Sequence, residues 1–114
     1  MKIKQFEIWV ADLNPQIGTE SGKVRPVLVV QTNLLNAYHP STIVCPLSTN
    51  VKAEVELLRV HLKRGDGNVT EDCDIMIDQL RAIDNKRLIK RVGDVPQKFK
   101  SMIKKNLNII LDLD

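Results

Sequence analysis

The sequence predicts a small α+β domain in which five or six short strands form a curled sheet or partial barrel, followed by one helix. Two observations support this fold class. Short apolar segments recur between turn-forming residues as far as residue 92, as in a protein built from short strands. From Pro96 onward the apolar residues recur at helical spacing. With 114 residues, 43% of them hydrophobic, the chain is expected to form one domain over residues 1–114.

The first two expected strands flank a polar loop. Apolar and other side chains alternate over residues 6–11, and the turn signal Asn14-Pro15 closes this strand. The second strand covers residues 26–31, and its unbroken apolar run over 27–30 is typical of a strand buried on both faces.

Arg25 lies at the mouth of the second strand, and Glu20 lies five residues earlier in the loop. Gly18 and Gly22 indicate a loop of defined shape, because glycine adopts backbone conformations that other residues resist. Two interpretations of this stretch stay open. Glu20 and Arg25 either present an anion and a cation to one substrate or form an ordinary surface pair.

The third strand is expected over residues 42–47. Pro46 favours an edge position or a strand terminus, because proline has no N–H to donate to a neighbouring strand. In the fifth strand, over residues 74–83, Asp78 and Gln79 interrupt an otherwise apolar run. The other expected elements are a loop with one helical turn over 32–40, a fourth strand over 54–62, a turn over 64–68, a capped helical turn over 84–87 and a sixth strand over 88–92.

The C-terminal helix is expected to bury one apolar face and to expose its lysines. The apolar face is formed by Phe99, Met102, Ile103, Leu107, Ile110 and Leu111. Lys98, Lys100, Lys104 and Lys105 lie mostly off that face, as in a solvated surface.

Composition limits the classes of function. The net charge is 17 − 14 = +3, which permits a nucleic-acid partner and equally suits an ordinary soluble protein. Cys45 lies in an apolar run and is expected to be a buried thiol, and neither cysteine has a second ligand at metal-binding spacing. We expect no metal site, no cofactor, no signal peptide and no membrane span, and therefore a cytoplasmic protein.

The polar side chains expected at strand ends suggest phosphoryl-transfer chemistry. His39 and His61 have no partner at a recognisable spacing, so a Ser-His-Asp arrangement has no support. The remaining candidates are Glu20, Arg25, Ser48, Thr49, Asp78 and Gln79. A carboxylate, an arginine and a hydroxyl suit cleavage of RNA, which supplies its own 2′-OH nucleophile, and arginine matches phosphate oxygens with paired donors. Ser48 and Thr49 cannot both face one site if the strand continues through them.

The chain resembles the MazF/PemK endoribonuclease toxins of type II toxin–antitoxin systems. The matching segments occur in order along nearly the whole chain: 7–15, 18–20, 25–30, 46–49 and 78–84. The resemblance implies an SH3-like barrel that acts as a homodimer. It also implies sequence-specific, metal-independent cleavage of single-stranded mRNA that leaves 2′,3′-cyclic phosphate and 5′-hydroxyl ends and inhibits translation and growth.

The resemblance also assigns roles to residues of this chain. Arg25 and Ser48 match the family's catalytic pair, although the hydroxyl residue is usually threonine and Thr49 leaves the register open by one residue. Glu20 is expected to assist as a base. Contacts to RNA are expected from Thr19, Lys23, Thr49, Asp78 and Gln79.

Partners and alternatives follow from the same resemblance. We expect a cognate antitoxin with an acidic, initially disordered segment that competes with RNA. Two alternatives come from other classes: a non-catalytic RNA-binding module, and a topoisomerase-inhibiting toxin of the same fold.

Overall fold

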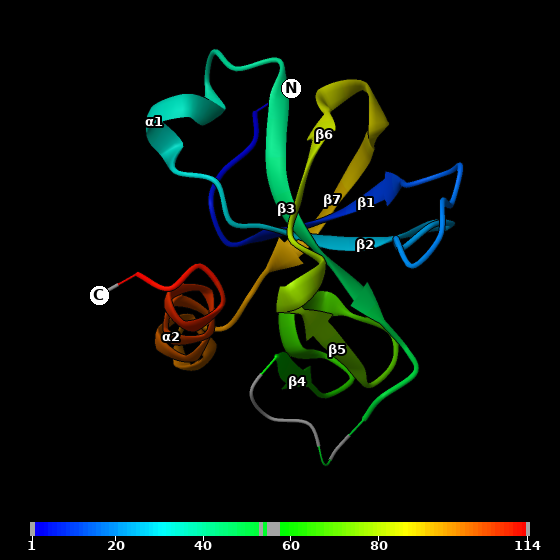
Figure 1. Cartoon of the computed structure of the whole chain (residues 1–114), viewed down its shortest axis with the longest axis vertical. Coiled ribbons are helices and arrows are strands. Elements are labelled where there is room, and N and C mark those ends of the chain that lie inside the picture. Colours follow the sequence, from blue (N-terminus) through cyan, green and yellow to red (C-terminus); the bar gives the residue numbers. More distant parts are fainter. Residues whose placement is uncertain (1, 53, 55–57, 114) are drawn as a thin grey trace.

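A computed structural model describes residues 2–52, 54 and 58–113. Within these residues, seven strands form an antiparallel open sheet with the order β4-β5-β3-β2-β1-β7, and β6 pairs with β3 beside this path (Figure 1). The strands are β1 (Glu7–Asp12), β2 (Val24–Val29), β3 (Ser41–Ser48), β4 (Arg59–Leu62), β5 (Cys73–Met76), β6 (Arg81–Asp84) and β7 (Leu88–Asp94). The helices are α1 (Asn33–Asn36) and α2 (Lys100–Ile110), with 3₁₀ turns η1 (Asp66–Asn68), η2 (Ile77–Gln79), η3 (Asn85–Arg87) and η4 (Gln97–Phe99).

Strand β3 is the centre of the fold, and the expectation that Pro46 marks an edge strand or a terminus is wrong. One side of β3 pairs with β2, where Val27 lies opposite Pro46. On its other side, residues 41–44 pair with β6 and residues 47–48 pair with β5. Pro46 therefore lies between the two segments that pair on that side, where the missing N–H breaks no regular ladder.

The fifth strand expected over residues 74–83 is two strands with a turn between them. β5 pairs with β3 and β4, whereas β6 pairs with the other end of β3. Asp78 and Gln79 lie in η2, the 3₁₀ turn that carries the chain from one pairing to the other. The polar pair inside an apolar run thus marks a break in the strand.

The fourth strand is shorter than expected. β4 begins at Arg59 instead of residue 54, and residues 55–57 of the predicted strand lie outside the described residues. The helical turn after residue 32, the capped turn at 84–87 and the last strand are confirmed. Asp84 caps η3 by accepting a hydrogen bond from the backbone N–H of Lys86 at 2.8 Å.

The sheet is buried on both faces, as the apolar run in β2 predicts. Val27 and Val29 belong to a cluster with Trp9 and Ile83, whereas Leu28 belongs to a larger cluster on the opposite face. This division arises because successive strand residues point to opposite faces. The larger cluster also includes Ile103 of α2, and Leu107 and Ile110 of the same helix pack against it. β2 is thereby fixed from both sides, which holds its first residues rigidly at the molecular surface.

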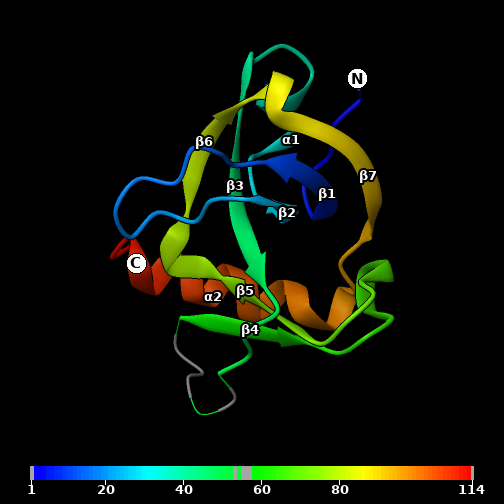
Figure 2. The ribbon, with the colours of Figure 1, turned by 90° about the vertical axis from the view of Figure 1, so that its right-hand side faces the viewer.

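Helix α2 packs across the sheet near η2 and β4 (Figure 2). Four of the six residues in the predicted apolar face, Phe99, Ile103, Leu107 and Ile110, pack against the core. Met102 and Leu111 do not, since they are 47% and 50% exposed. The described residues contain no helix with the length and hydropathy needed to span a bilayer.

Candidate functional site

The candidate site is a groove of about 370 Å³ between the start of β2 and the end of β3. Its lining comes from the start of β2, the end of β3 with the following turn, and the loop before β5: Lys23, Val24, Arg25, Pro26, Leu47, Ser48, Thr49, Asn50 and Glu71. Four of the residues proposed from sequence, Lys23, Arg25, Ser48 and Thr49, therefore lie together. Glu71 was not among the sequence candidates.

Arg25 is held in the groove by backbone carbonyls. Its Nε donates to the carbonyl oxygen of Gly22 at 2.9 Å, and its Nη1 donates to that of Leu47 at 3.3 Å. The side chain is half-buried, and these bonds occupy only part of its donor set. A guanidinium fixed in this way keeps N–H groups for an anionic ligand without losing much side-chain entropy on binding.

The β2–β3 register brings Ser48 to Arg25. Val27 pairs with Pro46 and Leu28 with Cys45, so continuing the register by two residues puts Arg25 opposite Ser48. Opposite residues of an antiparallel pair lie on one face, with Cβ atoms about 5 Å apart. Ser48 Oγ accepts a hydrogen bond from Asn50 N at 3.1 Å, which leaves its O–H free to donate.

Thr49 also lines the groove because β3 ends at Ser48. The rule that neighbouring strand residues face opposite ways no longer applies beyond the strand end. Thr49 is exposed, whereas Ser48 is half-buried beside Arg25. Both hydroxyl-bearing residues therefore line the groove.

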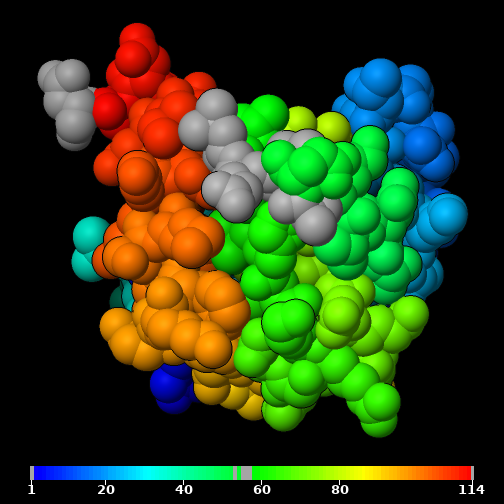
Figure 3. Space-filling model, turned by 90° about the horizontal axis from the view of Figure 1, so that it is seen from below, coloured from blue at the N-terminus to red at the C-terminus, as the bar shows by residue number. Residues whose placement is uncertain are grey.

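The loop between β1 and β2 is braced at its base by arginines. Arg81 Nη1 donates to the carbonyl oxygen of Ser21 at 3.3 Å, and Arg87 Nη1 donates to that of Asp12 at 3.0 Å. Arg25 also donates to the Gly22 carbonyl, so three arginines bond to backbone carbonyls in this loop or at its base. The sequence did not indicate that Arg81 and Arg87 support this loop, because their hydrogen bonds join segments that lie far apart along the chain. Figure 3 shows the loop, in blue, projecting on the side of the molecule away from α2.

Four sequence candidates lie outside the groove. Thr19 and Glu20 are exposed on the β1–β2 loop. Glu20 makes no ion pair with Arg25 within the described part of the chain, and the hydrogen bonds of Arg25 there go to backbone carbonyls. Asp78 is exposed and Gln79 is half-buried in η2.

Asp74, Arg59 and His61 form a charged network beside the groove that the sequence analysis missed. Asp74 is fully buried and bonds to Arg59 Nη1 at 3.0 Å and to His61 Nδ1. Burial would raise the pKa of Asp74, but hydrogen bonds from Lys52 N, His61 and Arg59 outweigh it and hold that pKa below its ordinary value. The expectation that His61 has no partner is therefore wrong. The position of Asp74 inside the apolar segment 73–77 could have predicted this network, because a buried carboxylate requires hydrogen-bonding or charged partners.

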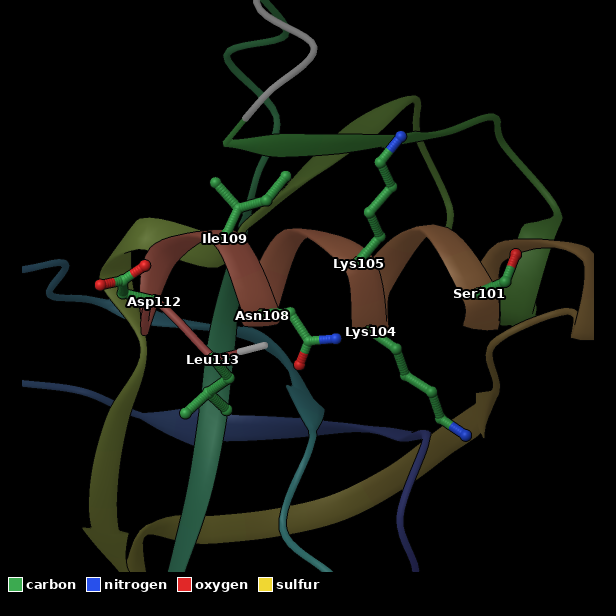
Figure 4. Close-up of a pocket in the computed structure, with 7 residues that line it drawn as sticks. All are labelled: Ser101, Lys104, Lys105, Asn108, Ile109, Asp112 and Leu113. Atoms are coloured by element: carbon green, nitrogen blue, oxygen red, sulfur yellow. The ribbon is translucent and has the colours of Figure 1, made fainter.

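A larger hollow of about 590 Å³ lies along α2 but has a different character. It is lined by Ser101, Lys104, Lys105, Asn108, Ile109, Asp112 and Leu113 (Figure 4). All these residues come from one helix and its C-terminal extension, and their side chains point in several directions in Figure 4. The groove at Arg25 has the converging polar groups that a binding site needs.

Neither thiol of the protein is suited to nucleophilic chemistry. Burial, with the Asp78 carboxylate as a second cause, raises the pKa of Cys45 to about 12. Burial and several nearby carboxylates raise that of Cys73 to about 11. Among the described residues, no cluster of three or more His, Cys, Asp or Glu side chains has a metal-binding arrangement.

The fold and the groove together define a small β-sheet protein with a cationic surface site. Residues 4–111 match the family described as PemK-like, MazF-like toxin of type II toxin-antitoxin system, and the chain belongs to this family. Endoribonuclease EndoA of Bacillus subtilis (strain 168) is 29% identical over 113 residues, which cover 99% of this chain and 97% of EndoA.

Two solved structures share the fold. A crystal structure of MazF from Deinococcus radiodurans superposes with a TM-score of 0.80 at 21% identity and covers 98% of both chains. A mycobacterial endoribonuclease in complex with its cognate antitoxin gives a TM-score of 0.80 at 17% identity, covering 98% of this chain and 97% of that one.

Proposed function

We propose that this protein is a metal-independent endoribonuclease and the toxin of a toxin–antitoxin pair. The observation that carries the proposal is that Arg25 is held by two backbone carbonyls in the same groove that Ser48 lines. Family membership and the endoribonuclease relative support the assignment. The proposed substrate is single-stranded mRNA cut at a short sequence, which would inhibit translation and growth.

The proposed reaction uses the substrate's 2′-OH as nucleophile. The 2′ oxygen attacks the adjacent phosphorus, the bond to the 5′ oxygen breaks, and the products carry a 2′,3′-cyclic phosphate and a 5′-hydroxyl. Arg25 stabilises the negative charge that accumulates on the phosphorane oxygens. The groove supplies this cation from the protein itself, so the proposed reaction needs no metal ion.

The other groups of the site act on protons and on binding. Ser48 donates its O–H to a phosphate oxygen or to the leaving 5′ oxygen. We assign the role of base to Glu20, whose exposed position on the loop leaves its carboxylate available to a bound substrate. Thr19, Lys23, Thr49, Asp78 and Gln79 are the proposed RNA contacts, and among them Lys23 and Thr49 line the groove.

The test is cleavage of a long RNA by the purified protein in excess chelator, with mapping of both fragment ends. Arg25→Ala should lower the rate by roughly two to three orders of magnitude, the range for removing one transition-state donor. Arg25→Lys should recover little, because a point charge cannot replace the planar fork. Arg64→Ala serves as the matched control, since this exposed arginine does not line the groove.

Other outcomes would select the alternatives. Cleavage that disappears with chelator and returns with magnesium would contradict the metal-independent mechanism. Tight RNA binding without cleavage would indicate the non-catalytic RNA-binding module, and inhibition of a topoisomerase without RNA cleavage would indicate the topoisomerase-inhibiting toxin.

We also propose a homodimer, a cytoplasmic location and an SH3-like curling of the sheet. Ile109, Leu111 and Leu113 at the end of α2 are 44%, 50% and 57% exposed, which supports a further protein surface there. Light scattering would measure the mass in solution, and Leu111→Glu should convert a dimer to monomers.

The pairing of β3 first with β6 and then with β5 supports a sheet that curls as in an SH3-like barrel.

The proposed regulator is an antitoxin whose acidic segment orders in the RNA groove. Lys23 and Arg25 form a cationic surface that suits carboxylates as well as phosphates. The structure of a mycobacterial relative in complex with its cognate antitoxin supports this kind of partner. Simultaneous binding of antitoxin and an uncleavable RNA analogue, without mutual effect on affinity, would contradict the shared groove.

A further inference from the structure

A row of polar side chains crosses four neighbouring strands at the level of the groove. Ser48 on β3 pairs with Asp74 on β5, and Asp74 pairs with His61 on β4. Arg25 on β2 lies opposite Ser48 when the β2–β3 register is continued. Because opposite residues of antiparallel strands share a face, the four side chains lie on one face in the order Arg25, Ser48, Asp74, His61.

Asp74 is the fully buried member of this row and does not line the groove. Its Oδ2 accepts from the backbone N–H of Lys52 at 2.9 Å and from Arg59 Nη1 at 3.0 Å. Its Oδ1 accepts from His61 Nδ1. The carboxylate therefore gathers three donors, one of which belongs to the chain segment directly after Ser48.

Arg59 links Asp74 to the turn that follows Ser48. The same Nη1 atom that contacts Asp74 also donates to the carbonyl oxygen of Asn50 at 3.1 Å. The N–H of Asn50 in turn donates to Ser48 Oγ at 3.1 Å. One buried carboxylate thus holds the turn over residues 48–52 at Lys52 directly and at Asn50 through Arg59.

We propose that Asp74 is a positioning residue for Ser48, acting through Arg59 and the 48–52 turn. This inference rests on the proposed endoribonuclease function. Asp74 touches neither the groove nor the substrate, and its effect is to fix the direction of the Ser48 hydroxyl against Arg25. A displacement of about 1 Å in such a group can lower a rate by about a hundredfold.

Asp74→Asn tests the proposal with little change in shape. The amide has one acceptor oxygen, so it cannot accept from Lys52 N, Arg59 and His61 together. We expect kcat to fall about ten- to a hundredfold, while KM for RNA changes less than about threefold. Asp72→Asn is the matched control, because this neighbouring carboxylate is exposed and bonds only to Arg64 N in the described structure.

A double-mutant cycle separates positioning from general stabilisation. If Asp74 acts through Ser48, Asp74→Asn should cost little further activity in a Ser48→Ala background. An equal loss of kcat in both backgrounds would overturn the proposal, as would an unchanged kcat in the single variant. If Asp74→Asn does not fold, Arg59→Ala gives the same test, because it removes the Nη1 atom that bonds both to Asp74 and to the carbonyl oxygen of Asn50.

Hydrogen exchange provides a readout that does not depend on catalysis. The Asn50 and Lys52 amides should exchange at least about tenfold faster in Asp74→Asn than in the wild type or Asp72→Asn. Wild-type protein that cuts no RNA would overturn the proposed function, and unchanged exchange at these two amides would overturn the positioning role. The two failures are thereby distinguishable.

Discussion

At the scale of single residues, the groove depends on groups that are fixed by backbone atoms. Arg25 is oriented by the carbonyls of Gly22 and Leu47, and Ser48 is oriented by the N–H of Asn50. Neither arrangement requires another charged side chain in the groove. Thr49, one residue beyond the strand, is exposed and has no comparable neighbour across the sheet.

This difference predicts unequal roles for the two hydroxyls. Ser48→Ala should lower RNA cleavage by about a hundredfold, because it removes a hydroxyl opposite Arg25. Thr49→Ala should change the rate by less than about fivefold and act mainly on RNA affinity. Single-turnover cleavage of one RNA by both variants makes the comparison, and the opposite ranking would identify Thr49 as the catalytic hydroxyl.

At the scale of elements, a buried carboxylate links β1 to β7. Glu7 Oε1 accepts from Lys4 N at 2.7 Å and from Trp9 Nε1 at 3.1 Å, and Oε2 accepts from Arg91 Nε at 2.7 Å. Burial would raise the pKa of Glu7, but these hydrogen bonds and the Arg91 charge hold that pKa below its ordinary value. Ionised Glu7 therefore stabilises the fold.

The sign of this shift predicts the pH dependence of a Glu7→Gln variant. A lowered folded-state pKa gives stability that is fully present above the unfolded pKa and is lost as pH falls through the folded pKa. At pH 7 the variant should be less stable by about 1–3 kcal/mol, since it leaves donors without a charged acceptor. Urea titrations should show this gap closing below about pH 4.

Glu71→Gln is the control for this measurement. Glu71 is exposed, so its substitution should change stability by less than about 0.5 kcal/mol at either pH. A gap between wild type and Glu7→Gln that stays constant from pH 7 to pH 3 would show that the charge of Glu7 does not contribute.

At the scale of the whole molecule, the core buries both thiols away from solvent and from reagents dissolved in it. Cys45 and Cys73 are unpaired, and they are 0% and 4% exposed in the larger apolar cluster. A thiol reacts as thiolate, and the pKa values of about 12 and about 11 leave little thiolate at neutral pH. Reaction therefore requires the core to open.

We predict that a thiol-reactive dye labels native protein at least about a hundredfold more slowly than protein unfolded in guanidinium chloride. Both cysteines should react in the unfolded chain. Val44→Ala, which leaves a void in the neighbouring cluster, should speed native labelling because it lowers the free energy of opening. Rapid labelling of the native wild type at either site would contradict the burial described for these thiols.

The sequence alone determined features that depend on local pattern. The apolar run 27–30 predicted a strand with both faces buried. Val27, Leu28 and Val29 of β2 are indeed fully buried. The Arg25-Pro26 junction placed a cation near the start of this strand, although β2 begins at Val24, two residues before the predicted start. The spacing of Phe99, Ile103, Leu107 and Ile110 specified the buried face of α2, since helical periodicity is also local.

The tertiary structure decided features that depend on which segments meet. The change of partners along β3 explains both the internal Pro46 and the split at Asp78 and Gln79, which local pattern presented as a strand end and as one long strand. The network of Asp74, Arg59 and His61 joins residues up to 15 positions apart. Long-range pairing creates such contacts, so a single sequence does not reveal that a buried carboxylate supports the turn after Ser48.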